Sequence, residues 1–206
     1  MDKPTDIEII AKNTVFKGFF RIDRYRIRHR RHDGTMSDPI EREVAGRGHI
    51  AAVLPVDPDR DRVVLVEQFR PGAMGAGWEP WSVECVAGII ETGEQVEDVA
   101  RRESIEECGC RIEALEPVHC FLTTPGALTE TVNLYCGKID SRDAGGIYGV
   151  SDEGEDIKVL VYTVEEAIAL AENGSINNAI TLIALQWLAL NYPSLKQRWR
   201  SDVRNS

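Results

Sequence analysis

Three glutamates, Glu103, Glu106 and Glu107, lie within five positions of one another in the segment RRESIEECGC, residues 101–110. Gly109 follows them and is a typical helix stop. Carboxylates near the C-terminus of a helix are unfavourable by roughly 0.3 to 1 kcal/mol, because the helix dipole is negative there. The cluster therefore requires an explanation other than helix stability.

Helical geometry places two of these carboxylates on an inward face. At about 100° per residue, Glu103 and Glu107 continue the stripe that Val96, Val99 and Ala100 begin. A solvated acidic face is the usual explanation of a charge run, but a position on the apolar stripe argues against it. Burial of unpaired carboxylates costs several kcal/mol per ion, in order of magnitude.

A divalent cation is the most direct way to neutralise this charge. Arg101 and Arg102 point away from the stripe, although Arg102 can reach the neighbouring carboxylates from the side and orient them. Magnesium takes oxygen ligands, and one or two carboxylates together with substrate phosphates typically hold it. The pattern favours a magnesium site over a solvated face.

Helical periodicity in three segments predicts the helices that must position these groups. The first runs from about Gly93 to Cys108, with Thr92 and Gln95 spaced as a capping box and Gly109 as its stop. The other two are residues 163–174 and 177–191, and the apolar density of 177–191 predicts a well-buried helix.

Short alternating runs predict the strands. Residues 19–31 form a hairpin with one cationic face and a turn at Asp33–Gly34, and 49–57 and 62–70 form an antiparallel pair around the turn PDRD. Further strands are expected at 82–87, 132–139 and 156–163. Strands around one central helix, with two helices late in the chain, predict an α+β fold with a mixed, largely antiparallel sheet.

Composition excludes several function classes. The chain has 206 residues and a net charge of -10, which argues against a general nucleic-acid or membrane surface. The N-terminus lacks the features of a signal peptide and no apolar run is long enough to span a membrane, so we expect a soluble, cytoplasmic protein. The five cysteines are expected to be buried, reduced thiols, and a metal role for Cys108 and Cys110 is disfavoured.

A longer pattern surrounds the glutamates. Gly88 is followed after five residues by Glu94, and after seven more by RESIEECGC, residues 102–110. This resembles the Nudix box, G-x5-E-x7-R-E-U-x-E-E-x-G-U with U apolar, at every charged and glycine position. Ser104 and Cys110 depart from it, since the family usually has aliphatic residues there. The chain is thereby identified as a member of the Nudix hydrolases, which hydrolyse a nucleoside diphosphate linked to another moiety.

The resemblance extends to one subgroup. Pro125 stands sixteen residues after Gly109, a distance typical of ADP-ribose pyrophosphatases, and segments from about Ile7 to Trp199 resemble the bacterial enzymes. The resemblance implies a Nudix α/β/α sandwich over residues 46–206. It also implies an N-terminal β-hairpin region over 1–45 that is exchanged between the subunits of a homodimer, and Mg²⁺-dependent hydrolysis of ADP-ribose to AMP and ribose 5-phosphate.

The resemblance also implies the catalytic residues. The carbonyl of Ala87, with Glu103, Glu107 and Glu155, would bind two or three Mg²⁺ ions, with Mn²⁺ as a substitute. Glu153 would be the general base, although the sequence leaves open whether Glu153 or Glu155 accepts the proton. The remaining residues expected in the catalytic machinery are Arg102 and Glu106.

The substrate contacts implied by the resemblance fall into three sets. Phe19 and Phe20 resemble an aromatic pair that a partner subunit places against adenine, with core packing of Phe20 as the alternative. Four charged residues resemble contacts to adenine, ribose and phosphate, each arginine having surface ion pairing as its alternative: Arg42, Glu43, Arg47 and Arg70. Five residues would line the terminal ribose: Ile89, Thr124, Pro125, Gly126 and Glu130.

Two other functions stay open. One is hydrolysis of a different nucleoside diphosphate sugar, such as GDP-mannose or ADP-glucose. The other is a sensor that binds ADP-ribose without cleaving it, which would be expected to lose box carboxylates and to gain a DNA-binding segment; neither feature is present in the sequence.

Overall fold

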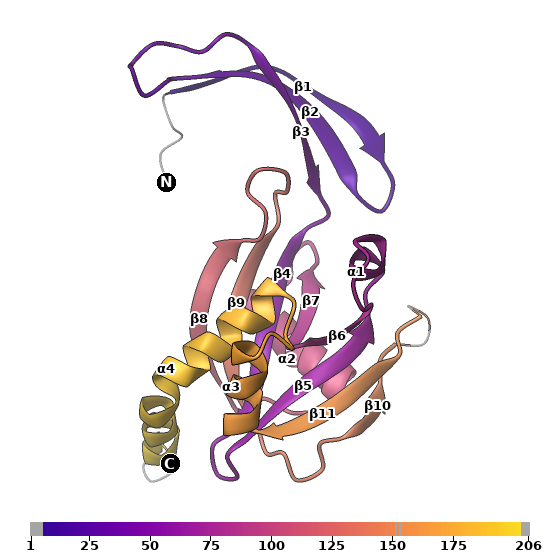
Figure 1. Cartoon of the computed structure of the whole chain (residues 1–206), viewed down its shortest axis with the longest axis vertical. Coiled ribbons are helices and arrows are strands. Elements are labelled where there is room, and N and C mark those ends of the chain that lie inside the picture. Colours follow the sequence, from indigo (N-terminus) through magenta and orange to yellow (C-terminus); the bar gives the residue numbers. More distant parts are fainter. Residues whose placement is uncertain (1–5, 151, 153, 203–206) are drawn as a thin grey trace. The chain divides into compact units, whose positions relative to one another are not determined.

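The computed structural model describes residues 6–150, 152 and 154–202, traced in Figure 1. The chain divides into two compact units. We call residues 1–49 with 122–131 the small unit, and residues 50–121 with 132–206 the large unit. The chain therefore passes from the small unit to the large unit, returns, and enters the large unit a second time.

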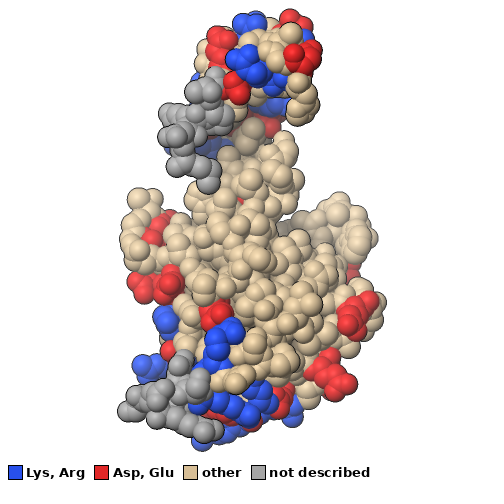
Figure 2. Space-filling view, turned by 90° about the vertical axis from the view of Figure 1, so that its left-hand side faces the viewer, with Lys and Arg blue, Asp and Glu red and all other residues tan. Residues whose placement is uncertain are grey.

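The small unit is an antiparallel sheet in the order β1 (Ile7–Lys17), β2 (Arg21–His29) and β3 (Ile40–Gly46). The hairpin expected within residues 19–31 was wrong, because these residues hold the single strand β2. The turn expected at Asp33–Gly34 is present and leads from β2 toward β3, and neither β1 nor β3 was predicted. The arginines of β2 are partly neutralised across the strands, since Arg24 pairs with Glu43 at 2.7 Å. Blue and red side chains are accordingly interspersed over the small unit in Figure 2.

Residues 122–131 complete the small unit by pairing with the end of β3. The amide of Ala45 donates to the carbonyl of Ala127, and the amide of Thr129 donates back to the carbonyl of Ala45. The apolar side chains of β1 stay exposed, among them Ile7, Ile9 and Phe16.

A sheet in the order β10-β11-β5-β4-β9-β8 forms the large unit, with β6 paired to β5 and β7 to β4. β4 runs parallel to β9, whereas β5 is antiparallel to β4, β6 and β11. The mixed sheet is thus confirmed. The strands are β4 (His49–Asp57), β5 (Arg62–Phe69), β6 (Trp81–Glu84), β7 (Val86–Ile90), β8 (Ala114–Leu122), β9 (Thr131–Lys138), β10 (Gly146–Tyr148) and β11 (Ile157–Thr163).

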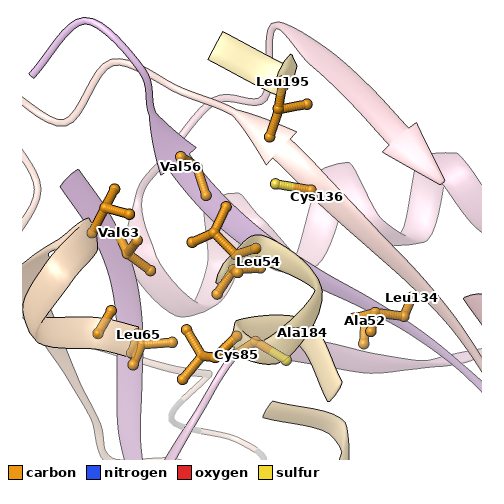
Figure 3. Packing of buried hydrophobic residues seen from close by; sticks show 14 of the residues in the cluster. Ala52, Leu54, Val56, Val63, Leu65, Cys85, Leu134, Cys136, Ala184 and Leu195 are labelled. Carbon is orange, nitrogen blue, oxygen red and sulfur yellow. The ribbon is translucent and has the colours of Figure 1, made fainter. Parts of the chain in front are cut away.

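Helices cover both faces of this sheet, as the expected sandwich requires. Because side chains alternate along a strand, Leu54 points to the cluster under α3 (Val164–Glu172) and α4 (Ala179–Asp202), whereas Val53 points to the cluster under α2 (Val96–Cys108). Figure 1 shows these helices on opposite faces, and Figure 3 shows the first cluster. Each fully buried leucine contributes about 1.5 to 3 kcal/mol.

Two helix boundaries differ from the prediction. The helix α2 begins at Val96 and has no side-chain cap, so the capping box of Thr92 and Gln95 was wrong; Glu94 instead accepts a hydrogen bond from the amide of Glu91 at 2.8 Å. The helix α4 continues through Pro193 to Asp202, well past the expected end. The extra turns bury Leu195 and Trp199, which offsets the hydrogen bond that a proline removes.

Smaller features also depart from the predictions. The strand expected at 82–87 is two strands, β6 and β7, that pair with different neighbours. The short helix α1 (Pro71–Gly75) was not predicted, nor were β8 and β10. All five cysteines are free thiols, but Cys120 is exposed because it lies on the edge strand β8. None of the described helices is long and apolar enough to cross a membrane.

Candidate active site

The inward stripe of α2 is confirmed. Val99 and Ala100 are buried in the large unit, and Glu107, two turns further along, is only 3% exposed. Gly109 ends the helix in the left-handed conformation, with φ 66°, and its amide donates to the carbonyl of Ile105. Tyr148 of β10 lies so close to Gly109 that a Cβ there would be 2.5 Å from the tyrosine Oη. Glycine is therefore required here by conformation and by space.

Both carboxylates of the stripe meet β7 at adjacent residues. The amide of Ala87 donates to Oε2 of Glu107 at 3.2 Å. The carboxylate of Glu103 lies against the α-carbon of Gly88, where a Cβ would be 1.8 Å from Oε1. The first glycine of the box is therefore required because the Glu103 carboxylate occupies the space that a side chain at position 88 would need.

The electrostatic environment disfavours two charges at this point. The pKa of Glu107 is raised to about 8, mainly by burial. The hydrogen bond from Ala87 and the charge of Arg70 oppose this rise, and the charges of Glu103 and Glu155 contribute to it. Burial also raises the pKa of Glu103, which the Arg102 charge partly opposes. Of these two carboxylates only Glu103 has an arginine partner among the described residues, so a hard divalent cation would stabilise the pair.

The oxygen atoms at this site suit a cation that takes only some of its ligands from the protein. Among the described residues, no three His, Cys, Asp or Glu side chains converge into a complete ligand set. Magnesium commonly keeps several waters and takes substrate phosphate oxygens, so an incomplete protein ligand set is suited to it.

Arg102 holds the carboxylates from the side, as its place on the helical wheel predicts. Its guanidinium contacts Glu106 at 2.7 Å, Glu103 at 2.9 Å and Glu94 at 3.6 Å. These pairs orient three carboxylates of the box, and they leave Glu107 without an arginine contact of this kind among the described residues.

Arg70 is placed at the same site by its ion pair with Glu84. Nε and Nη2 of Arg70 donate to the two Glu84 oxygens at 2.8 to 3.2 Å. The ion-pair alternative weighed for this arginine is therefore what the structure contains, although the positive charge still acts on Glu107 and Glu155. Nη1 makes no hydrogen bond to the described part of the chain, so it is free to bind an anion.

Glu155 lies at the base of the loop that connects β10 and β11. The amide of Val150 donates to Oε2 of Glu155 at 3.0 Å, and the Glu155 Cβ packs against the α-carbon of Gly149, which has φ 107°. The negative charge of Glu155 acts on both Glu103 and Glu107. Glu153, the expected general base, lies outside the described residues, so its role stays a prediction.

Expected adenine and ribose contacts lie in the small unit. The Arg47 guanidinium stacks on the Phe19 ring at 3.5 Å, and the Phe19 and Phe20 rings meet edge to face at 5.2 Å. Phe19 is 65% exposed and Phe20 44%, so Phe20 is not a core residue. Glu43 pairs with Arg24, and exposed Arg42 contacts only the carbonyl of Glu41 within the described chain.

The residues expected near the terminal ribose divide between the two units. Thr124 closes a turn by accepting hydrogen bonds from the amides of Ala127 and Leu128. Glu130 accepts from the Thr123 hydroxyl at 3.0 Å, and exposed Pro125 and Gly126 lie between them. These residues belong to the small unit, whereas half-buried Ile89 lies in β7 of the large unit.

Sequence reasoning missed Glu84 and Gln68 of the large unit. Glu84 has no signal in the sequence, because its pairing with Arg70 depends on the register between β5 and β6. Gln68 did have one, since it is a polar residue that interrupts the apolar run of a central strand.

The chain is similar to known proteins over most of its length. The NUDIX domain matches residues 47–182. The chain is 50% identical to ADP-ribose pyrophosphatase of Escherichia coli K12, over 94% of this chain and 93% of the relative. It is 42% identical to ADP-ribose pyrophosphatase of Haemophilus influenzae, over 95% and 91% of the two chains.

More distant similarities extend to other substrates and to solved structures. GDP-mannose pyrophosphatase of Cronobacter sakazakii is 32% identical over 90% of this chain and 96% of its own. A crystal structure described as an ADP compounds hydrolase superposes with a TM-score of 0.66 at 18% identity, covering 92% of this chain and 97% of the other, which supports the fold. On the matched domain and the full-length relatives, the chain belongs to the NUDIX family of hydrolases.

Proposed function

We propose that the protein hydrolyses the pyrophosphate of ADP-ribose to AMP and ribose 5-phosphate with Mg²⁺. The observation that carries this proposal is the meeting of the Glu103 and Glu107 carboxylates at Ala87 and Gly88, without a cation of the protein to neutralise both. The identity of 50% to an ADP-ribose pyrophosphatase over nearly the whole chain supports the choice of substrate.

In this mechanism the residues of the large unit bind the ions and the pyrophosphate. Glu103, Glu107, Glu155 and the Ala87 carbonyl would hold Mg²⁺, which when bound neutralises the pyrophosphate and lowers the pKa of the attacking water. Arg70 would bind a phosphate oxygen through its unoccupied Nη1. Arg102 keeps Glu103 and Glu106 oriented.

The reaction needs one proton acceptor. A water oxygen attacks one phosphorus of the pyrophosphate, the bond from that phosphorus to the bridging oxygen breaks, and the bridging oxygen leaves with the other phosphate. Glu153 would accept the proton of the water. Glu155 is the alternative acceptor, but its hydrogen bond from the Val150 amide favours a fixed, ligand-holding role.

A second substrate is favoured by one observation, the 32% identity to GDP-mannose pyrophosphatase. The identity is lower than that to the ADP-ribose enzymes, so ADP-ribose is the stronger proposal. The test is kcat/KM for ADP-ribose, GDP-mannose and ADP-glucose with Mg²⁺, and with EDTA as the control. Equal or faster turnover of GDP-mannose would contradict the choice of ADP-ribose as the substrate. Tight binding of ADP-ribose without any cleavage would favour a sensor.

We further propose a homodimer in which the small unit of one subunit contributes to the substrate site of the other. The exposed apolar side chains of β1 offer an interface, and Phe19 stacked with Arg47 offers a flat surface for a purine. Phe19→Ala should raise KM for ADP-ribose more than it lowers kcat. Sedimentation equilibrium measures the dimer, and a monomer with full activity would contradict it.

A further inference from the structure

Gln68 is a buried glutamine whose amide nitrogen has no partner. The residue is 7% exposed, on the central strand β5 of the large unit. Its Nε2 is the buried side-chain polar atom without a hydrogen bond in the described part of the chain. Buried donors are nearly always satisfied, so an exception calls for an explanation in terms of a bound group.

The strand register places this amide beside the carboxylates of the active site. Side chains alternate along β5, so Gln68 shares a face with Val66, which packs in the cluster under α2, and with Arg70. Val66 is opposite Glu84 on β6, which is the partner of Arg70. Gln68 therefore lies between the buried floor of the site and its phosphate-binding arginine.

The neighbouring strand leads to the same location. Glu67 is paired with Lys158 on β11, which makes the fully buried Ile157 the neighbour of Gln68. Glu155 comes two residues before Ile157 in the chain, ahead of the start of β11. Gln68 thus lies between Ser82 of β6 and Ile157 of β11, on the face of β5 that carries Val66 and Arg70.

The neighbouring carboxylates accept hydrogen bonds from donors other than Gln68. Glu84 receives three hydrogen bonds from Arg70, Glu107 receives the amide of Ala87, and Glu155 receives the amide of Val150. Folding alone does not favour a glutamine here, because an unbranched apolar side chain of similar size would avoid the unpaired amide. An oxygen of a bound ligand would supply the acceptor that this amide lacks.

We propose that Nε2 of Gln68 donates a hydrogen bond to a non-bridging oxygen of the substrate pyrophosphate, beside Arg70. This inference rests on the proposed function. A neutral donor is suited to this position because it binds a phosphate oxygen without adding a positive charge that would repel Mg²⁺ from Glu103 and Glu107. Gln68 is then a substrate-contacting residue that the hydrolysis of any nucleoside diphosphate sugar would use.

The test compares Gln68→Met, which keeps the length and removes the donor, with Gln68→Glu, which replaces the donor by an acceptor. The dissociation constant of the non-hydrolysable α,β-methylene analogue of ADP-ribose is measured by calorimetry with Mg²⁺, together with the thermal midpoint of each free protein. Q68M should bind the analogue about tenfold more weakly, the typical effect of one lost hydrogen bond. Q68E should bind it more weakly still, while the thermal midpoint of Q68M stays equal or rises.

Two outcomes would overturn the proposal. One is an unchanged affinity of Q68M for the analogue. The other is a fall in its thermal midpoint together with equal losses for the analogue and for Mn²⁺ binding without nucleotide, which would mark Gln68 as structural. Absence of ADP-ribose cleavage by the unaltered protein would instead refute the proposed function, and the analogue titration would still decide the role of Gln68.

Discussion

Replacing Glu107 by Gln should stabilise the metal-free protein while removing most of its turnover. The carboxyl is 3% exposed, and its burial raises the pKa to about 8. At pH 7 the unfolded chain ionises this group, whereas the folded chain keeps it protonated. With an ordinary pKa of 4.5 and about 1.36 kcal/mol per pH unit, the carboxyl lowers the free energy of unfolding by about 3 kcal/mol at pH 7.

The direction of the pH dependence follows from the raised pKa. Between about pH 4.5 and 8 the folded protein binds more protons at Glu107 than the unfolded chain does, so this carboxyl costs more stability as the pH rises through that window. A glutamine is neutral throughout, and its carbonyl can accept the Ala87 amide. The unpaired amide group of the glutamine offsets part of the gain, so we expect Glu107→Gln to raise the free energy of unfolding by about 1 to 3 kcal/mol at pH 7.

The assay is urea unfolding in EDTA at several pH values, repeated with Mg²⁺. Glu106→Gln is the matched control, because the Glu106 carboxylate is half-buried and paired with Arg102; its effect should stay within about 1 kcal/mol. Mg²⁺ should stabilise the unaltered protein more than the Glu107 variant, since binding to the folded state raises stability by mass action. A loss of stability of E107Q in EDTA at pH 7 would refute the reasoning and make Glu107 a structural residue.

Three further substitutions have defined outcomes. Gly88→Ala forces the Glu103 carboxylate from its place, and a displacement of about 1 Å should cost about 100-fold in kcat; normal steady-state kinetics would contradict this. Gly109→Ala should lower the free energy of unfolding by about 1 to 2 kcal/mol for the left-handed backbone, and more for the contact with Tyr148, as measured by urea unfolding. Asp57 accepts hydrogen bonds from Ser141 and Arg60 that outweigh its burial and lower its pKa. Asp57→Asn should therefore cost about 2 kcal/mol at pH 7, and the difference should shrink as the pH falls below about 4; an equal difference at low pH would exclude the carboxylate as its source.

The positions of the carboxylates in the candidate site were predictable because their spacing lies within one helix. The positions of Glu103, Glu107 and Gly109 on α2 follow from a period of 3.6 residues and from the glycine stop, and both were confirmed. The helix start was not predictable, because the side chain of Glu94 binds the Glu91 amide in place of a regular cap. The hydrogen bond between Glu94 and the Glu91 amide thus takes the place of the capping box that was expected between Thr92 and Gln95.

The remainder of the site depends on pairings between distant segments. Glu84 becomes a partner of Arg70, and Gln68 its neighbour, through the register of β5 and β6. The strands β1, β3, β8 and β10 were not predicted for the same reason, since strand stability comes from cross-strand contacts more than from intrinsic preference. Helix α4 passes Pro193 because tertiary burial of Leu195 outweighs a local rule.

The pairing of Ala45 with residues 127–129 has a consequence for biosynthesis. During translation, β1, β2 and β3 leave the ribosome first, but the segment that completes their sheet follows only after most of the strands of the large unit. A nascent chain ending before residue 122 would therefore hold an unfinished edge at β3, with apolar side chains of β1 exposed. Closing such a long loop is slow relative to forming a hairpin, so this strand edge is where chaperones would be expected to engage the emerging polypeptide.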